Sequence, residues 1–331
     1  MRKLVDDARL IFKCCCLYYQ DGLGQQEICQ RLGISRPTVS RMLNLGRERG
    51  IVRIELRNPD NEMFGQMERD LEQKFGLQEV VIVQSSPIQQ GGKEGERPQM
   101  DIGRAALRFL SRILNDGDYV GVTMGLTIQS IVQSDYFINE RISCTFVPLV
   151  GGIGESQLEI HSNYLAQKFA SRFGGSCVQF FLPAVLSRKG VLEGIMKENM
   201  IQRVVRLYRK LDVLVLGIGI PFTESSTIFR TGYVDHEILD RFHRMGAVGD
   251  IALRYFDIHG DTKPFDDFNE RVAGISLDQM KKVSRRIGVA SGIQKAEAVL
   301  GAVRGGYINI LITDIDCANR LVELDAGKVM D

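Results

Sequence analysis

Residues 25–43 read QQEICQRLGISRPTVSRML, and this stretch decides the fold of the N-terminal part of the chain. A helical pattern ends at Gly33, since glycine readily takes the left-handed backbone conformation that follows a helix. Ser35 is a good residue to precede the next helix. Pro37 falls in that helix's first turn, where a missing N–H costs nothing. The stretch therefore predicts two helices, residues 25–32 and one that begins after Ser35, joined by a tight turn.

The second of these helices has an apolar and a polar face. Val39, Met42 and Leu43 share the face that would pack inward. The opposite face carries arginines and short polar side chains, as a helix that enters the major groove of DNA requires. The candidates for DNA contact are Gln25, Gln26, Ser35, Arg36, Thr38, Ser40, Arg41 and Arg47. We expect Arg36 to read a guanine edge and Arg47 to contact a phosphate.

The neighbouring segments complete a small basic domain. Residues 6–19 have helical spacing of apolar residues and residues 51–56 alternate as a strand does, which predicts a winged helix-turn-helix over residues 1–57. These residues hold 11 Lys and Arg against six Asp and Glu, a net charge of +5, while the remainder carries −4. Such a distribution is typical of a nucleic-acid-binding module joined to a second domain. An ordinary three-helix domain with a charged surface is the alternative.

Composition sets the class of the whole protein. The chain has 331 residues, is 44% hydrophobic and has a net charge of +1, which indicates about two folded domains and disfavours a non-specific nucleic-acid binder. No apolar segment approaches the roughly 18 residues of a membrane span, and charges interrupt the N-terminus where a signal peptide would be apolar. The seven cysteines and four histidines lack the spacing of a metal site. We expect a cytoplasmic protein without metal or membrane association.

A helical segment joins the N-terminal domain to the rest of the chain. Residues 62–75 have an apolar side chain at every fourth position, namely Met63, Met67, Leu71 and Phe75. That stripe would pack either on the chain's own C-terminal domain or on the same helix of a second copy. We assign residues 58–78 to a linker helix.

From residue 79 onward, apolar β-branched segments alternate with amphipathic helical ones. Strands are predicted at 79–84, 118–123, 143–150, 176–181, 212–218, 251–256, 286–290 and 307–313. Helices are predicted at 101–115, 126–134, 157–173, 188–209, 235–244 and 294–304. Strands that are apolar throughout indicate a parallel sheet covered on both faces. We therefore expect residues 79–331 to form an α/β domain with a mostly parallel, Rossmann-like sheet.

Glycine-rich segments follow several of these strands. In open parallel sheets, ligands bind where strand C-termini meet helix N-termini, and residues 121–127 (GVTMGLT) and 148–154 (PLVGGIG) lie at such junctions. Free backbone N–H groups there would hold an anion. The candidates are Thr123, Gly125, Leu126, Thr127, Gly151 and Gly152. No segment matches a nucleotide-binding fingerprint, so we expect no cofactor.

Lys295 lies at a position where a positive charge is unfavourable for helix stability. Lys295 falls in the first turn of the helix predicted at 294–304, where its charge opposes the helix dipole. A bound anion would explain it, whereas pairing with Glu297 is the structural alternative. His161 and Asn163 are possible further pocket residues, because they begin the helix after the 148–154 junction.

Residues 25–43 resemble the DNA-binding domain of the SorC/DeoR family of sugar-responsive bacterial regulators, and the resemblance continues through nearly the whole chain. It implies that Gly125, Leu126 and Thr127 hold the phosphate of a sugar-phosphate effector. It also implies that Asp250, in GAVGDIA, hydrogen-bonds the ligand's hydroxyls and that Lys295, in ASGIQKAEA, pairs with the ligand. The C-terminal domain would then resemble phosphosugar isomerases in fold. Met124 and Ser291 depart from the family pattern, and these departures bear on the identity of the sugar.

These observations predict a transcriptional regulator of a carbohydrate-utilisation operon. Its affinity for double-stranded operator DNA would be set by a phosphorylated sugar, and the chain would form a homodimer or homotetramer, because paired DNA-binding domains bind two half-sites. The alternative is a phosphosugar isomerase-like enzyme with an accessory nucleic-acid-binding domain, in which Lys295 and Asp250 act as an acid/base pair. No spacing of nucleophile, histidine and acid supports the enzyme, so we expect no catalysis.

Overall fold

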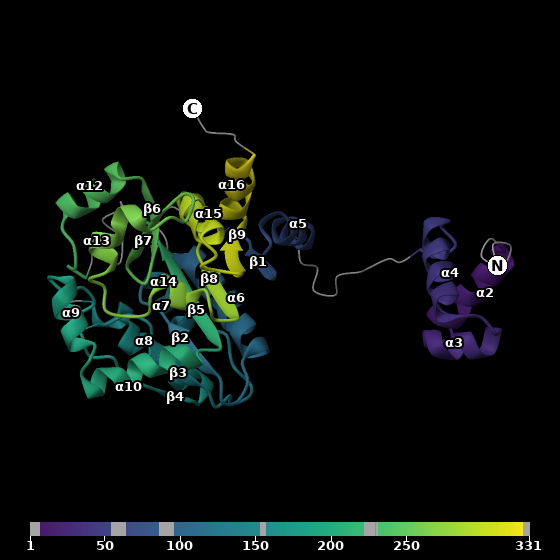
Figure 1. Cartoon of the computed structure of the whole chain (residues 1–331), viewed down its shortest axis with the longest axis horizontal. Coiled ribbons are helices and arrows are strands. Elements are labelled where there is room, and N and C mark those ends of the chain that lie inside the picture. Colours follow the sequence, from purple (N-terminus) through teal and green to yellow (C-terminus); the bar gives the residue numbers. More distant parts are fainter. Residues whose placement is uncertain are drawn as a thin grey trace. The chain divides into compact units, whose positions relative to one another are not determined.

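The computed structural model describes residues 7–53, 64–85, 96–152, 157–221, 229 and 231–326. It divides the chain into two compact units, Met1–Met63 and Phe64–Asp331, which are called the head and the body below (Figure 1). Each unit has its own apolar core.

The described part of the head is a bundle of three helices. These are α2 (Ala8–Tyr19), α3 (Gln25–Leu32) and α4 (Arg36–Glu48), as the sequence predicted. Their core consists of Ile11, Cys14, Cys15, Leu17, Ile28, Val39, Met42 and Leu43. Gly33 has a φ of 66°, the left-handed conformation that ends α3, and Ser35 has the extended backbone of a residue that precedes a helix.

The predicted wing strand is not present where the structure describes it. Residues 51–53 form bends rather than a strand, and the remaining residues of the predicted strand lie outside the described part of the chain. Ile51 and Val52 instead pack against the head core, and the Val52 N–H donates to the carbonyl of Gly46 at 3.0 Å. Their burial accounts for the apolar residues that gave the strand-like pattern.

The body is built on a mostly parallel sheet, which confirms the predicted α/β class. The main path is β1-β9-β8-β5-β2-β3-β4, with all pairs along it parallel. Its strands are β1 (Glu79–Val83), β2 (Tyr119–Val122), β3 (Thr145–Pro148), β4 (Ser176–Cys177), β5 (Val213–Gly219), β8 (Arg285–Val289) and β9 (Ile310–Asp314). The central strands are apolar on both faces because helices cover both.

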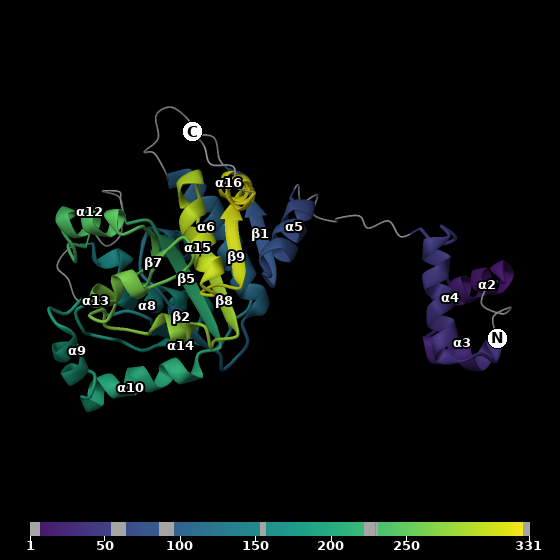
Figure 2. The ribbon, with the colours of Figure 1, turned by 45° about the horizontal axis from the view of Figure 1, so that its top comes forward.

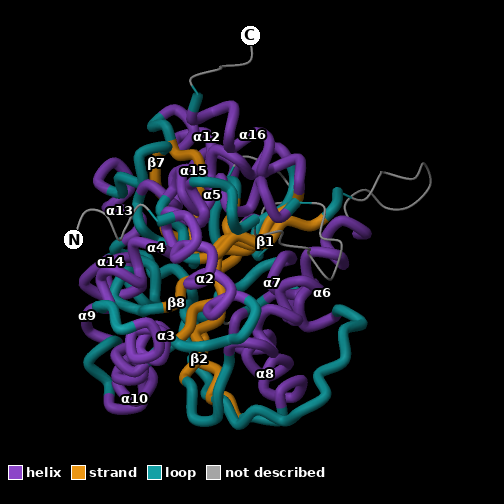
Figure 3. The backbone as a smooth tube through the Cα atoms, turned by 90° about the vertical axis from the view of Figure 1, so that its right-hand side faces the viewer, coloured by secondary structure: helices purple, strands orange, loops and turns teal. Residues whose placement is uncertain are grey.

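The sheet separates two layers of helices, seen edge-on in Figure 3. One layer contains α6 (Glu96–Ile113), α7 (Leu126–Gln133) and α8 (Ser162–Phe173), which form one core with side chains such as Val213 and Val215. The other layer, visible in front of the sheet in Figure 2, contains α10 (Asn199–Leu207), α14 (Leu277–Met280), α15 (Ala296–Arg304) and α16 (Ile315–Asp325). Leu214 and Leu216 face this second core, as strand alternation requires.

The linker helix packs on the body. Helix α5 (Gly65–Phe75) buries Leu71 completely in the body core, and Met67 and Phe75 lie partly buried beside it. Of the two possibilities for this apolar stripe, the structure therefore shows the contact with the chain's own body. The side chains of Glu72 and Glu68 accept the backbone N–H groups of Val80 and Ile82, at 2.9 and 2.8 Å, and so cover the free edge of β1.

Several element predictions need correction. The single strand predicted at 251–256 is an antiparallel hairpin, β6 (Ala247–Ile251) and β7 (Arg254–Asp257), because Ala252 and Leu253 take positive φ values and reverse the chain. The predicted helix 188–209 is broken into α9 (Lys189–Ile195), α10 and the short η2 (Tyr208–Lys210). The predicted helix 157–173 is η1 (Leu158–Ile160) followed by α8.

Four further helices complete the described chain: α12 (His236–Arg244), η3 (Lys263–Phe265), α13 (Asp266–Asn269) and η4 (Ile293–Lys295). Helix α16 was not predicted from the sequence. In the part of the chain that the structure describes, no helix has the length and apolar character needed to cross a bilayer.

Candidate functional site

The head presents a polar surface on α4. Arg36, Arg41 and Arg47 are exposed, while Val39 and Met42 on the opposite face are fully buried. The arginines therefore lie free of the head's own core and are available to a nucleic acid.

Local hydrogen bonds shape this surface. The hydroxyls of Ser35 and Thr38 lie 2.8 Å apart at the start of α4, and Arg47 donates to the side-chain carbonyl of Asn44 at 2.6 Å. Ser35 precedes the helix as predicted, but its side chain does not cap a backbone N–H. Ser40 is half-buried on the same helix, as is Thr38.

A side chain of α3 itself accepts a hydrogen bond at the start of this helix. Gln25 and Gln26 occupy its first turn, with Gln26 the more exposed. The Glu27 carboxylate accepts the N–H of Gly24 at 2.7 Å. This carboxylate already satisfies part of the helix N-terminus, so a phosphate at this point would meet an acidic neighbour.

In the body, the C-terminal end of β5 brings together residues from several loops. Gly217 donates its N–H to the Thr123 hydroxyl at 2.9 Å, and that hydroxyl donates to the Val215 carbonyl at 3.4 Å. Thr123 is almost fully buried. Its hydroxyl is thus engaged within the sheet, where it fixes the loop that leads into α7 against β5.

The N-terminus of α7 points out of this loop. Gly125 precedes the helix with a φ of 122°, a conformation that favours glycine, and its N–H donates to the Ile160 carbonyl at 2.9 Å. No described side chain caps the helix, and Leu126 and Thr127 in its first turn are half-buried. Uncapped N–H groups and the helix dipole make this end of α7 attractive to an anion.

The loop after β3 lies beside the start of α8. Gly151 donates to the Ala273 carbonyl at 2.8 Å, and a Cβ on Gly151 would come within 2.4 Å of the Leu182 carbonyl oxygen. Asn163 donates to the carbonyls of Gly152 and Phe180, each at 3.1 Å. The Asn163 amide therefore holds the Gly151–Gly152 turn in place.

The side chain of His161 packs against the same turn. It is buried at the residue that precedes α8, and a Cβ on Gly152 would lie 3.0 Å from its Nδ1 atom. The Tyr233 hydroxyl lies 3.4 Å from the same nitrogen. His161 thus packs between the turn and a tyrosine.

Asp250 lies opposite Gly219, where β6 pairs with β5. The carboxylate accepts the Leu253 N–H at 3.2 Å, and a Cβ on Gly219 would come within 2.0 Å of its Oδ1 atom, so only glycine leaves room for it. Burial raises the pKa of Asp250 to about 6, against smaller lowering effects of the Lys295 ammonium and the Leu253 N–H. Residues 247–250, which come before the strand predicted at 251–256, belong to strand β6.

Lys295 reaches the same strand end from the other side. Its ammonium donates to the Ile218 carbonyl at 2.8 Å. Burial lowers the pKa of Lys295, while the carboxylate of Asp250 acts in the opposite direction. The lysine ends the short helix η4 and immediately precedes α15.

The end of β5 therefore brings together three of the eight candidates for ligand binding, namely Thr123, Asp250 and Lys295. Residues 217–219 contact Thr123, Asp250 and Lys295, and Gly217 also lies against the first turn of α7. Gly219, the glycine that leaves room for Asp250, directly follows the strand predicted at 212–218, and nothing in the sequence pattern marks it as part of the site. No group of three or more His, Cys, Asp or Glu able to hold a metal ion occurs among the described residues.

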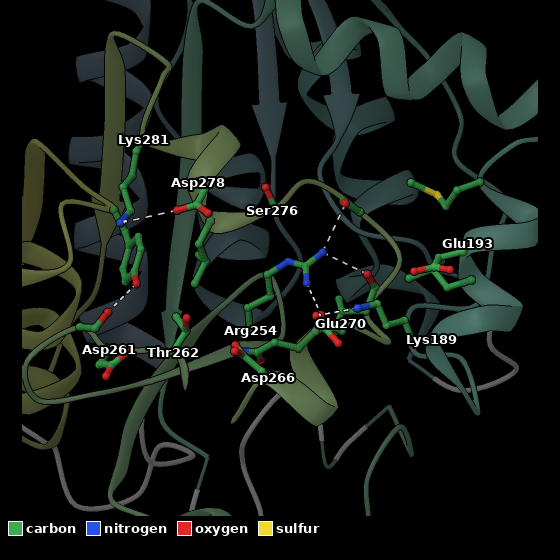
Figure 4. A pocket seen from close by; sticks show the side chains of 18 residues that line it. Lys189, Glu193, Arg254, Asp261, Thr262, Asp266, Glu270, Ser276, Asp278 and Lys281 are labelled. Carbon is green, nitrogen blue, oxygen red and sulfur yellow. Dashed lines mark hydrogen bonds and ion pairs between the residues drawn. The ribbon is translucent and has the colours of Figure 1, made fainter. Parts of the chain in front are cut away.

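A separate cleft of about 500 Å³ is lined by residues of α9, β7, α13 and α14 and of the loops between them (Figure 4). Its floor is Arg254, which is 8% exposed. The guanidinium donates to the carbonyls of Ile275 at 2.8 Å, Val272 at 3.0 Å and Gly274 at 3.3 Å, and also to that of Asn269. Burial lowers the pKa of Arg254 to about 10.

Two ion pairs lie among the residues that line this cleft. Lys189 pairs with Glu270 at 2.9 Å, and Lys281 lies 3.8 Å from Asp278. Arg254 donates to carbonyls within residues 272–275, and the Ala273 carbonyl accepts the Gly151 N–H. Arg254 therefore helps to hold the Gly151–Gly152 turn in place.

A three-helix head with arginines exposed on α4, and a body with an uncapped helix N-terminus at one end of a parallel sheet, are typical of a two-part, ligand-responsive regulator. Comparison with known proteins agrees: residues 61–323 match the family model of a sugar-binding domain, and residues 17–61 match that of the MarR family. The chain belongs to the SorC family of sugar-binding transcriptional regulators. It is a DNA-binding transcriptional regulator and not an enzyme.

Individual relatives extend over nearly the whole chain. The sorbitol operon regulator of Klebsiella pneumoniae is 31% identical over 322 residues, 96% of this chain and 99% of that protein. The deoxyribonucleoside regulator of Bacillus subtilis is 32% identical and covers 92% of this chain and 95% of its own. The crystal structure of full-length SorC from Klebsiella pneumoniae superposes with a TM-score of 0.70, covering 96% of this chain and 99% of that one.

Proposed function

We propose that the effector of this regulator is a phosphorylated sugar that binds at the C-terminal end of β5. The observation that carries the proposal is the meeting there of the uncapped α7 N-terminus, the buried Asp250 and the Lys295 ammonium. The backbone N–H groups of Leu126 and Thr127 would hold the phosphate. Gly151 and Gly152 would form the facing wall.

The two ionisable groups would serve different parts of the ligand. Asp250 accepts hydrogen bonds when ionised, so it suits sugar hydroxyls. Among the described residues, the Ile218 carbonyl and the nearby Asp250 stabilise the charge of Lys295, and an anionic group of the ligand would be a stronger partner than that carbonyl. Thr123 would contribute by holding the loop that leads into α7 in place against β5.

The second partner would be double-stranded operator DNA, bound in the cytoplasm by paired heads. Arg36 lies at the start of α4, where a recognition helix reads base edges, and Arg41 and Arg47 follow along the exposed face. A single head offers few contacts, so we infer that the chain binds as a homodimer or homotetramer on two half-sites. The regulated genes would serve carbohydrate use.

Thermal unfolding against sugar phosphates tests the effector. The panel includes sorbitol 6-phosphate and deoxyribose 5-phosphate, chosen because the relatives are named for sorbitol and deoxyribonucleosides, each beside its unphosphorylated counterpart. A ligand at a hundred times its Kd stabilises by about 2.7 kcal/mol, which raises Tm by several degrees. We expect a shift with a phosphorylated compound that is lost in Lys295→Ala and kept in Lys282→Ala, an exposed lysine that precedes the opposite end of β8. No shift with any phosphorylated compound would refute the proposed effector class.

Substitutions in α4 test the DNA-binding surface. Arg36→Ala is expected to weaken binding to the operator by about 1–3 kcal/mol while leaving binding to random DNA unchanged, because a base contact carries sequence information. Arg47→Ala is expected to weaken binding to both and to lower the salt slope by about 1. Fluorescence anisotropy with the two duplexes at several salt concentrations measures this, and equal loss on both duplexes for Arg36→Ala would contradict its role.

A further inference from the structure

The buried carboxylate of Asp314 joins two parts of the body. One is residues 292–295, which carry Lys295 and are called the Lys295 turn below, and the other is the helix α16. Asp314 ends β9 and is 3% exposed. One of its oxygens accepts the N–H of Gly292 at 2.9 Å, and the other accepts the N–H of Cys317 at 3.0 Å. The first bond fixes the glycine that begins the Lys295 turn, and the second caps the N-terminus of α16.

The other end of α16 is tied to the linker helix. Asp325, the last residue of α16, lies 3.2 Å from the ammonium of Lys74 in α5. The same carboxylate lies 3.4 Å from Arg304 of α15. Between its two ends α16 buries Cys317, Ala318 and Leu321 in the body core, so the helix is packed along its length.

Helix α5 is itself fixed to the sheet and is the element of the body that leads to the head along the chain. Glu68 and Glu72 hold it on the edge of β1, and β1 pairs with β9, the strand that carries Asp314. A displacement of the Lys295 turn would therefore reach α5 through α16, a helix of 11 residues, because packed elements move as units.

We propose that Asp314 is a positioning residue of the effector site and that α16 couples this site to the linker helix α5. Asp314 holds the turn from which Lys295 reaches the ligand. When the Lys295 ammonium leaves the Ile218 carbonyl for a bound phosphate, the turn shifts, and Asp314 passes the shift to the start of α16. The Lys74–Asp325 pair passes it on to α5. This inference rests on the proposed effector site.

The positioning role is tested with Asp314→Asn in the full chain. The amide keeps the size of the side chain but loses the charge and one acceptor, so the Gly292 and Cys317 N–H groups can no longer both be held. We expect faster hydrogen exchange over residues 291–295 and 315–318 in the ligand-free protein, and an effector Kd raised about tenfold. The probe is the sugar phosphate that gives the largest thermal shift with the wild-type protein. Glu323→Gln, an exposed carboxylate of the same helix, is the control.

The coupling role is tested by comparing two partners of one carboxylate. Lys74→Gln removes the contact of Asp325 with α5, whereas Arg304→Gln removes only its contact with α15. The Kd for operator DNA is measured with and without the probe. The ratio of these two Kd values measures the coupling between effector binding and operator binding. We expect Lys74→Gln to reduce this ratio by about two- to fivefold, the range for a half-exposed ion pair, with probe Kd unchanged. Arg304→Gln should keep the wild-type ratio.

The outcomes separate this inference from the proposed effector. Unchanged exchange at the Gly292 turn in Asp314→Asn would overturn the positioning role whatever the ligand is. A wild-type ratio in Lys74→Gln, or an equal loss in Arg304→Gln, would overturn the route through α5. If no sugar phosphate binds the wild-type protein, the proposed effector fails, and the exchange measurement still decides whether Asp314 joins the turn to α16.

Discussion

At Asp250, burial sets the ionisation of a single side chain. Its pKa is about 6 in the folded protein against an ordinary 3.8, so the folded state keeps the proton over a pH range in which the unfolded state has released it. Rising pH between these values therefore lowers the free energy of unfolding, and the ionised carboxylate destabilises the fold by about 3 kcal/mol at neutral pH. This cost is what a bound ligand with hydroxyl donors would offset.

Asp250→Asn makes that cost measurable. The amide still accepts the Leu253 N–H but carries no charge, so the stability of the variant relative to wild type should rise by up to about 3 kcal/mol from pH 4 to pH 7 and stay level above that. Urea unfolding at each pH gives the difference. Asp316→Asn, which removes an exposed carboxylate, is the control. A difference that does not change with pH would mean that Asp250 ionises normally.

Gly219→Ala tests the space around the same carboxylate. A Cβ there would lie 2.0 Å from the Asp250 Oδ1 atom, so the carboxylate has to move. We expect a loss of about 1–3 kcal/mol in stability, the usual cost of overpacking, together with loss of the sugar-phosphate thermal shift. Gly190→Ala in α9, with open space around its Cβ, should instead be neutral or slightly stabilising. Full retention of the thermal shift in Gly219→Ala would remove Asp250 from the site.

At the scale of elements, the close approach of α2 and α4 defines the head. Gly46 in α4 is buried against α2, and a Cβ on it would come within 2.4 Å of the Cys15 sulfur. The glycine thus sets how closely the two helices pack, which in turn determines where α4 holds Arg36 and Arg41. Sequence periodicity placed Gly46 within a helix but gave no sign of this contact.

Gly46→Ala should destabilise the head by about 1–3 kcal/mol through overpacking, partly offset by the better helix propensity of alanine. Operator affinity should fall with it, while the sugar-phosphate thermal shift of the body stays as in wild type. Adding Cys15→Ala removes the clashing sulfur, so the double variant should recover most of the loss. Failure of the double variant to recover would show that the two helices are not held at this distance.

At the scale of the whole molecule, the separate cores of head and body predict two unfolding transitions. Among the described residues, the side chains of the head core come from residues 10–52, and the two body cores lie on either face of one sheet. Calorimetry should show that a sugar phosphate raises the transition of the body alone and that operator DNA raises that of the head, because each ligand stabilises the unit it binds. A single transition shifted by either ligand would indicate that the units unfold together.

The sequence by itself determined the two-part organisation and the class of each part. Gly33, Ser35 and the alternating faces of α4 specify a helix-turn-helix through local conformation, and uninterrupted apolar strands specify a parallel sheet, because burial on both faces leaves no polar alternation. Both signals are local, so they can be found without knowing how the chain folds.

Only the tertiary structure decided which residues lie together at the proposed site and which contacts hold them there. Asp250 lies in β6, which runs antiparallel to β5. Positive φ values at Ala252 and Leu253, which side-chain patterns do not show, then turn the chain back into β7. The space at Gly219 and the two bonds of Asp314 join residues distant in sequence. Such contacts depend on the register between strands and on the packing of helices, and these are set by the whole fold rather than by any local pattern.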